Sequence, residues 1–273
     1  MDIRSRRNPK IQRVRRLQSS ARARRAARRF VAEGVRLAEE ALRAGWLPEW
    51  VLFTPDLSPR GQAVVAAFRE QGVPAFATDP EALAAASATE TPQGILLVLP
   101  IRALPLPTEA DFLLVVDGVR DPGNLGTILR TAWAAGVQAA LLTPDSADPF
   151  NPKVVRAGMG AHFRLPLRRE PWESLRKHLT HQQVYVAAAD GALPYTHMPA
   201  RRPIALVVGG EAEGVGPRLR RFAHQTVAIP MPGHAESLNA AVAAGILLFE
   251  VVRQREESNR STFGKQPADE RGG

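Results

Sequence analysis

The stretch FLLVVDGVRDPGNLGTILRTAWAAGV, residues 112–137, decides the fold of this 273-residue chain. Its first five residues are all apolar, which is typical of a strand buried on both faces of a parallel sheet. Pro122 and Gly123 then suit a type II turn, and Asn124 is a good N-cap for a helix that begins at Leu125. Arg130 would lie about two turns into that helix. A buried strand, a turn and a helix are the repeating parts of an α/β fold.

The same apolar pattern returns downstream of this stretch. It recurs at AALL (139–142), VYVAA (184–188), IALVV (204–208) and VAI (227–229). These runs predict a mostly parallel sheet that is covered by helices on both faces. A last helix, from about residue 238 to 252, is apolar nearly all round and should be buried. Beyond Arg253 the chain is charged and without periodicity, so residues 254–273 are predicted to be a disordered tail.

A smaller α/β domain is predicted upstream, over residues 30–100. FVAEGVRLAEEAL (30–42) has apolar residues at helical spacing, and helices around 62–70 and 81–86 alternate with strands at 50–53, 73–77 and 95–99. Three prolines between 100 and 107 then favour a linker at 101–110. The main domain would occupy residues 111–253.

Residues 1–29 are predicted to be a basic arm. They hold 12 of the 36 lysines and arginines and are opposed by Asp2 alone, whereas the remainder carries 24 basic and 26 acidic residues. Charge this concentrated suits a polyanion, because each cation near a phosphate releases a counterion. A passive solvated tail and a mitochondrial targeting peptide are the alternatives.

Composition excludes several other classes. The chain has no cysteine, which excludes disulfides and zinc sites built on thiolates. The sequence contains no run of about 18 apolar residues, so no membrane span is predicted. We therefore expect a cytoplasmic protein without a membrane partner, with mitochondrial import left open by the arginine-rich N-terminus.

Three loops are unusual among those that follow the apolar runs, where open α/β sheets bind ligands. The first opens the segment DGVRDPGNLGTILRTAWAAGV (117–137), which follows a strand and leads into a helix. The second, VVGGEAEGVG (207–216), is rich in glycine but matches neither G-x-G-x-x-G nor a Walker sequence. The third, VAIPMPGHAESLNAAVAAGILLFEVV (227–252), consists of a strand, a loop bracketed by prolines and a helix that starts at Ser237, which could cap it. His234 and Ser237 do not indicate a hydrolase, because no G-x-S-x-G surrounds the serine.

Taken in this order, the three loops resemble the motifs of the SpoU/TrmH RNA methyltransferases of the SPOUT superfamily. The most specific matches are the spacing of Asn124 and Arg130, the pair Gly209 and Glu211, and the triplet Ser237-Leu238-Asn239. The segment 30–42 also looks like the ribosomal-protein-like substrate-binding domain that is often fused to this family. Gly210 and Ala212 depart from the family pattern, which has a polar residue and a glycine there.

The resemblance implies a fold, a cofactor and a set of site residues. The C-terminal parallel-sheet domain would contain a trefoil knot that binds S-adenosylmethionine, and no metal would be required. The residues implied for cofactor binding are Gly209, Gly210, Ile229, Met231 and Leu238. The residues implied for catalysis are Asn124, Arg130, Glu211, Ser237 and Asn239. The family also implies a homodimer whose active site uses both subunits.

The reaction implied is methyl transfer to a ribose 2′-hydroxyl of RNA, with ribosomal RNA favoured over transfer RNA. DNA is excluded as a substrate because it lacks that hydroxyl. Arg130 suits a clamp on an RNA phosphate better than a base, since a guanidinium is effectively always protonated. Two alternatives are a non-catalytic RNA-binding or ribosome-assembly protein on the same fold, and a dinucleotide-dependent oxidoreductase, which the missing G-x-G-x-x-G disfavours.

Overall fold

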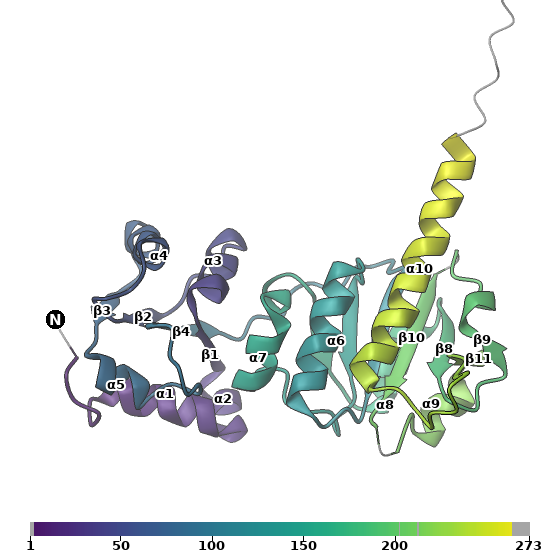
Figure 1. The fold of residues 1–273 in the computed structure, drawn as a ribbon, viewed down its shortest axis with the longest axis horizontal. Coiled ribbons are helices and arrows are strands. Elements are labelled where there is room, and N and C mark those ends of the chain that lie inside the picture. The colour runs from purple at the N-terminus through teal and green to yellow at the C-terminus, as the bar shows by residue number, and fades with distance from the viewer. Residues whose placement is uncertain (1–2, 202, 212, 264–273) are drawn as a thin grey trace, which may run out of the picture.

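The computed structural model describes residues 3–201, 203–211 and 213–263, and it consists of two α/β domains joined by an irregular linker (Figure 1). The first domain has a four-stranded sheet of order β1-β4-β2-β3. Its strands are β1 (Arg29–Glu33), β2 (Trp50–Phe53), β3 (Ala75–Ala77) and β4 (Ile95–Pro100). β4 runs antiparallel to β1 and β2, whereas β2 and β3 are parallel.

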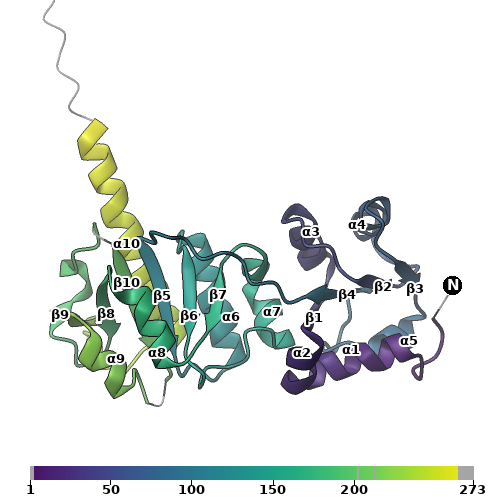
Figure 2. The same ribbon diagram turned by 180° about the vertical axis from the view of Figure 1, so that it is seen from behind.

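Helices cover both faces of this sheet (Figure 2). α3 (Val35–Arg43) and α4 (Pro59–Glu70) lie on one face, and α1 (Pro9–Ser19) and α5 (Pro80–Ala84) lie on the other, with α2 (Ala21–Ala27) directly after α1. Side chains alternate along β1, so Phe30 joins the cluster under α3 and α4, and Val31 joins the one under α1 and α5. Two apolar layers therefore hold the first domain together.

The structure places residues 9–27 in helices of this domain, which corrects the expectation of an arm ahead of it. Ile11, Val14 and Leu17 are spaced for one face of α1 and are fully buried against the sheet. The sequence analysis did not identify these three apolar residues as a helix face, because arginines lie between them. A helix was expected over residues 30–42, but it begins only at Val35. Residues 29–33 form a strand instead.

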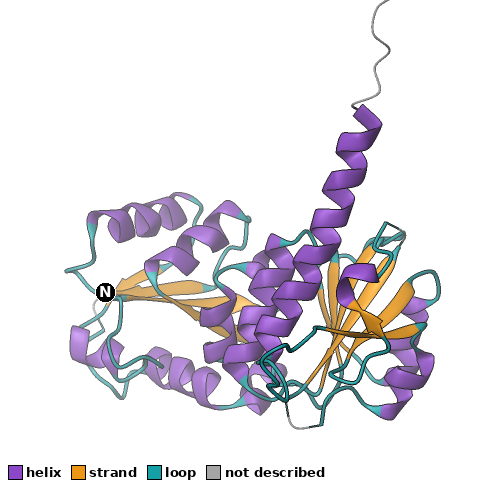
Figure 3. Cartoon of the chain, turned by 45° about the vertical axis from the view of Figure 1, so that its right-hand side comes forward, coloured by secondary structure: helices purple, strands orange, loops and turns teal. Residues whose placement is uncertain are grey.

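The second domain has a seven-stranded sheet of order β7-β6-β5-β10-β8-β11-β9, and its neighbouring strands pair in parallel, as the apolar runs predict. Helices flank this sheet (Figure 3). Its strands are β5 (Phe112–Asp117), β6 (Ala139–Leu142), β7 (Leu167–Arg169), β8 (Gln183–Ala187), β9 (Leu193–Pro194), β10 (Ile204–Gly209) and β11 (Gln225–Ala228). Its helices are α6 (Pro122–Ala134), α7 (Pro152–Gly158), α8 (Trp172–Leu175), α9 (Pro217–Phe222) and α10 (Ala240–Phe263). The sequence missed β7 and β9, which are too short to show a pattern.

The last helix differs from its prediction at both ends. α10 begins at Ala240, with Asn239 rather than Ser237 accepting from the first backbone N–H groups. It continues through residues 254–263, which were expected to be disordered, while residues 264–273 of the predicted tail lie outside the described residues. Arg253 supports the extension by pairing with Glu250 and Glu257, one turn to either side. Within the described residues, no helix is long and apolar enough to cross a membrane.

The two domains share an apolar junction. Phe150 and Phe163, from the segment around α7, pack against Phe30 and Trp46 of the first domain, with ring centroids 5.0 Å apart for Phe30 and Phe150 and 5.3 Å apart for Trp46 and Phe163. Val155 of α7 is buried in the same cluster. Aromatic side chains bury large apolar areas, so the contact stabilises one relative placement of the domains.

Candidate active site and cofactor cavity

The three unusual loops meet at one edge of the large sheet, because β5, β10 and β11 are parallel and end there. The backbones approach each other so closely that only glycine fits at two positions. A Cβ added to Gly209 would collide with the backbone of Gly214, and one added to Gly210 would collide with the carbonyl oxygen of Gly118. Hydrogen bonds fix this contact, since the Gly210 N–H donates to the Asp117 carbonyl over 3.0 Å.

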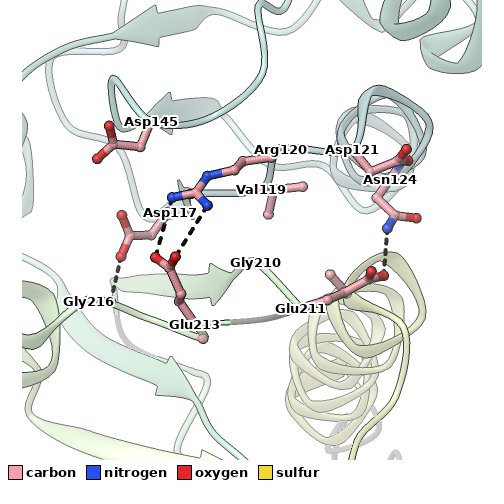
Figure 4. Close-up of a pocket in the computed structure, with 13 residues that line it drawn as sticks. Asp117, Val119, Arg120, Asp121, Asn124, Asp145, Gly210, Glu211, Glu213 and Gly216 are labelled. Atoms are coloured by element: carbon pink, nitrogen blue, oxygen red, sulfur yellow. Dashed lines mark hydrogen bonds and ion pairs between the residues drawn. The ribbon is translucent and has the colours of Figure 1, made fainter.

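A hydrogen-bonded network of three side chains joins the loops. Asn124 donates to the Glu211 carboxylate over 2.7 Å (Figure 4). Asn239 donates to the same Glu211 oxygen over 2.8 Å and to the Asn124 carbonyl oxygen over 3.0 Å. Glu211 thus accepts hydrogen bonds from two side-chain amides, and each of the three loops contributes one residue to the network. Four of the five residues implied for catalysis belong to these loops, and three of them are in direct contact.

Local structure fixes the amides of this network. Asp121, not Asn124, caps α6: its carboxylate accepts from the Asn124 backbone N–H over 2.7 Å, and this bond holds the pKa of Asp121 below its usual range. Asn124 therefore lies within the first turn of α6, where its side chain is available to Glu211. Asn239 has two tasks, because its oxygen caps α10 while its nitrogen serves the network.

A cavity of about 300 Å³ lies behind the network, between the second and third loops. All five residues implied for cofactor binding line it, and so do Glu211 and Ser237. The apolar side chains of Ile229, Met231 and Leu238 suit an adenine ring, while the absence of side chains at the half-buried Gly209 and Gly210 lets a ligand approach the backbone closely. These residues fit S-adenosylmethionine in size and chemistry. No group of His, Asp or Glu in the described part of the chain is arranged to hold a metal ion.

A second cavity, of about 270 Å³, lies on the other side of the network (Figure 4). It shares Gly210, Glu211, Gly214 and Ala240 with the first cavity. Five of its thirteen lining residues are acidic, and its one arginine, Arg120, pairs with Glu213 over 3.2 Å. Glu211 of the network therefore lines both cavities, a position that suits a group between two reactants.

Arg130 and Ser237 are the two residues implied for catalysis that the chain does not bring into this network. Arg130 is the more distant. It is exposed on α6, and within the described residues no hydrogen bond or ion pair of Arg130 occurs. Arg130 lies six positions after Asn124, which places the two on different faces of the helix. Ser237 lines the cofactor cavity but does not belong to the hydrogen-bonded network.

The sequence reasoning missed two charged residues of the cofactor cavity. Asp190 follows β8, and Arg220 of α9 donates to it over 3.0 Å, which lowers the pKa of the Asp190 carboxyl. Asp190 lies three residues after a strand end, so the rule that pointed to the other loops would also have found it. Arg220 carried no such signal, because its place depends on how α9 packs.

Comparisons with known proteins match both domains. Residues 111–249 match the SpoU rRNA Methylase family, and residues 8–97 match the MRM3-like substrate binding domain. A Bacillus subtilis protein, the 23S rRNA (guanosine(2553)-2′-O)-methyltransferase RlmP, is 36% identical over 81% of this chain and 88% of its own length.

Solved structures agree along nearly the whole chain. An AdoMet-bound rRNA methyltransferase from Sinorhizobium meliloti superimposes with a TM-score of 0.83 and 32% identity, covering 93% of this chain and 98% of its own. The AdoMet complex of the SpoU methyltransferase AviRb from Streptomyces viridochromogenes also has a TM-score of 0.83, with 29% identity over 92% of this chain and 99% of its own. The similarity thus includes both domains and the cofactor-binding half.

Proposed function

This chain belongs to the SpoU rRNA methylase family, and from that premise we propose that it methylates the ribose 2′-hydroxyl of a guanosine in large-subunit ribosomal RNA. It is an S-adenosylmethionine-dependent RNA 2′-O-methyltransferase. The observation that carries the proposal is the contact of Asn124, Glu211 and Asn239 beside a cavity lined by all five residues implied for cofactor binding. Guanosine is proposed because the similar Bacillus subtilis enzyme is named for it.

When bound, S-adenosylmethionine would supply a methyl group on a sulfonium, with the neutral thioether as the leaving group. The ribose hydroxyl is a poor nucleophile until its proton is drawn away. Glu211 is anchored by two amides, so it holds Asn124 and Asn239 in fixed orientations from which they position the ribose. Arg130 would clamp an RNA phosphate through its planar pair of donors, leaving the proton to that phosphate or to a water molecule.

We propose that the site is completed by a second copy of the chain. Two large apolar side chains, Val242 and Phe249, are 50% and 48% exposed on α10. α10 packs beside α6, which carries the exposed Arg130. A twofold contact through this face would cover the apolar side chains and carry Arg130 of each copy toward the other copy's network.

The experiment mixes two variants that are each expected to be inactive. Arg130→Ala should fold and bind S-adenosylmethionine yet retain less than about a tenth of the single-turnover rate, a barrier increase above about 1.4 kcal/mol. Arg130→Lys should rescue little, because one ammonium cannot replace a two-donor fork. When Arg130→Ala and Asn239→Ala subunits are mixed, a heterodimer contains one site with both native residues, so activity should return.

Wild-type activity in either variant alone would remove that residue from the mechanism. A mixture that stays inactive would mean that each site uses residues of one subunit. Calorimetry with S-adenosylmethionine separates the enzyme from a non-catalytic RNA-binding protein, which would have no need for the cofactor. Mapping of 2′-O-methylated positions in ribosomal RNA, with and without the gene, would identify the nucleotide.

A further inference from the structure

A buried arginine joins the first domain to the catalytic edge of the second. Arg24 of α2 is only 3% exposed, and its guanidinium donates to the Leu17 and Gln18 carbonyls over 2.7 and 3.0 Å. It also donates through two nitrogens to one oxygen of Asp148, over 2.9 and 2.7 Å. The same side chain therefore closes the end of α1 and crosses the domain boundary.

Asp148 belongs to the loop 143–151, which leaves the carboxyl end of β6 beside the three site loops. The next residue back, Ala147, donates its N–H to the Val119 carbonyl of the first site loop over 2.9 Å. Asp145 of the same loop lines the acidic cavity next to the network. The Arg24–Asp148 ion pair and the hydrogen bond from Ala147 to Val119 thus connect Arg24 to the candidate active site.

The helices held by Arg24 present concentrated positive charge. No acidic residue occurs between residues 3 and 28. Arg22 and Arg25 are exposed one turn apart on α2 and have no ion pair within the described residues. In Figures 1 and 2, α1 and α2 lie along the lower side of the first domain, the side on which α10 begins and the site loops gather. Basic helices and active site thus face the same way.

We propose that Arg24 and Asp148 are positioning residues, which hold the basic face of α1 and α2 at a fixed distance from the catalytic edge so that one RNA contacts both. Arg22 and Arg25 bind phosphates of that RNA. This inference rests on the proposed function. Glu81 and Glu49 pair with Arg6 and Arg13 on this face, whereas Arg22 and Arg25 have no acidic partner within the described residues. An excess of cations over carboxylates suits a phosphate backbone better than a protein surface, which carries both signs. The apolar contact of Phe30 and Phe150 beside the ion pair keeps the junction rigid.

The test uses Asp148→Asn in the full chain. Asparagine keeps the oxygen that accepts from the Phe150 N–H, so the loop should persist, but it offers Arg24 no carboxylate. For a ribosomal RNA fragment long enough to reach α2, kcat/KM should fall at least about tenfold, mainly through KM. For a fragment of a few nucleotides around the target, it should stay unchanged, as should S-adenosylmethionine binding. Arg24→Lys should give the same split, because a compact ammonium cannot span the acceptors that the planar guanidinium reaches from three nitrogens.

Asp111→Asn is the matched control. Asp111 also accepts from an arginine that donates to backbone carbonyls, Arg255, but the pair lies within one domain and at the opposite end of β5. This variant should treat long and short fragments alike. In addition, Arg22→Gln with Arg25→Gln should weaken long-fragment binding in the native background and have a smaller effect beside Asp148→Asn, since additivity fails only for coupled sites.

Equal losses on long and short fragments, or full additivity of the substitutions, would overturn the positioning role. If an acidic protein displaced RNA from α2, the basic face of α1 and α2 would instead be a binding site for a protein partner. Binding of the long fragment is measured by fluorescence anisotropy alongside turnover. If the native protein shows the coupling in binding but transfers no methyl group to any RNA, the proposed function fails and the positioning role stands.

Discussion

Asn239 shows how one side chain can serve both stability and chemistry. With the last helix expected to begin at Ser237, Asn239 would lie in its first turn, and alanine there should leave the melting temperature almost unchanged. The structure makes Asn239 the cap of α10, so Asn239→Ala should also destabilise the protein by about 1 kcal/mol. Alanine alone can no longer separate the two roles.

Asn239→Ser separates them. Serine is a good N-cap, so thermal unfolding should resemble that of the native protein, but its short side chain cannot reach Glu211. Single-turnover methyl transfer should fall about 10- to 1000-fold, a barrier increase of roughly 1.4 to 4 kcal/mol. A serine variant with native turnover would leave Asn239 as a helix cap and nothing more.

His162 makes stability depend on pH. It is buried near the domain junction, where one ring nitrogen lies 2.7 Å from the Pro149 carbonyl oxygen, and burial lowers its pKa from 6.5 to about 4. Because the unfolded chain binds this proton more readily, stability is complete above about pH 6.5 and is lost as pH falls toward 4. The loss amounts to about 3 kcal/mol. His162→Gln keeps a donor for Pro149 but does not titrate. Urea unfolding at pH 7 and pH 4.5 should show a smaller difference for the variant, and equal differences would contradict this account.

At the scale of elements, the buried strands were predictable and the first helices were not. Runs such as 112–116 and 204–208 need no tertiary context, because continuous apolar residues already indicate a strand between two layers. α1 carries only three buried apolar residues among arginines, so its charge dominated the interpretation. Its burial depends on a sheet whose strands lie up to residue 100. The same limit applies to Arg24, which looked like one more surface cation.

Deleting residues 1–29 is therefore expected to disrupt the first domain, rather than remove a dispensable arm. The deletion would take Ile11, Val14 and Leu17 out of the core, and each large-to-small change at such a site costs about 2–5 kcal/mol. Circular dichroism should show loss of cooperative unfolding of that domain. Native stability of the truncated protein would contradict this expectation and would support the prediction that residues 1–29 are a dispensable arm. A variant with Arg22→Gln and Arg25→Gln serves as the control, because it removes charge without touching the core.

For the whole molecule, the order of motifs was sufficient to anticipate the two-domain plan and the parallel sheet, and the resemblance predicts which loops bind the cofactor. The contacts between distant segments were not, since they depend on packing that no local pattern encodes. The Asn124, Glu211 and Asn239 contact is an intermediate case: the resemblance named the residues, and the structure supplied their bonds. The trefoil knot and the dimer remain predictions.

Phe249→Glu tests the dimer. Phe249 is 48% exposed, so the change should cost the monomer's stability little, whereas it would place a charge within the proposed twofold contact. Light scattering should give the mass of a dimer for the native chain and of a monomer for the variant, with methyl transfer reduced in parallel. Glu256→Gln, an exposed change farther along α10, should leave the mass unaltered. If Phe249→Glu had the same mass as the native chain, the proposed twofold contact would not include Phe249.

The apolar junction between the domains also constrains how the protein is made. Phe30 and Trp46 emerge early in synthesis, but their aromatic partners, Phe150 and Phe163, follow only after the linker and the first strands and helices of the second domain. A nascent first domain therefore exposes an aromatic surface until the ribosome has passed residue 163, and such surfaces promote misassembly. Folding of the first domain is completed by the second, so this enzyme is best produced as one uninterrupted chain.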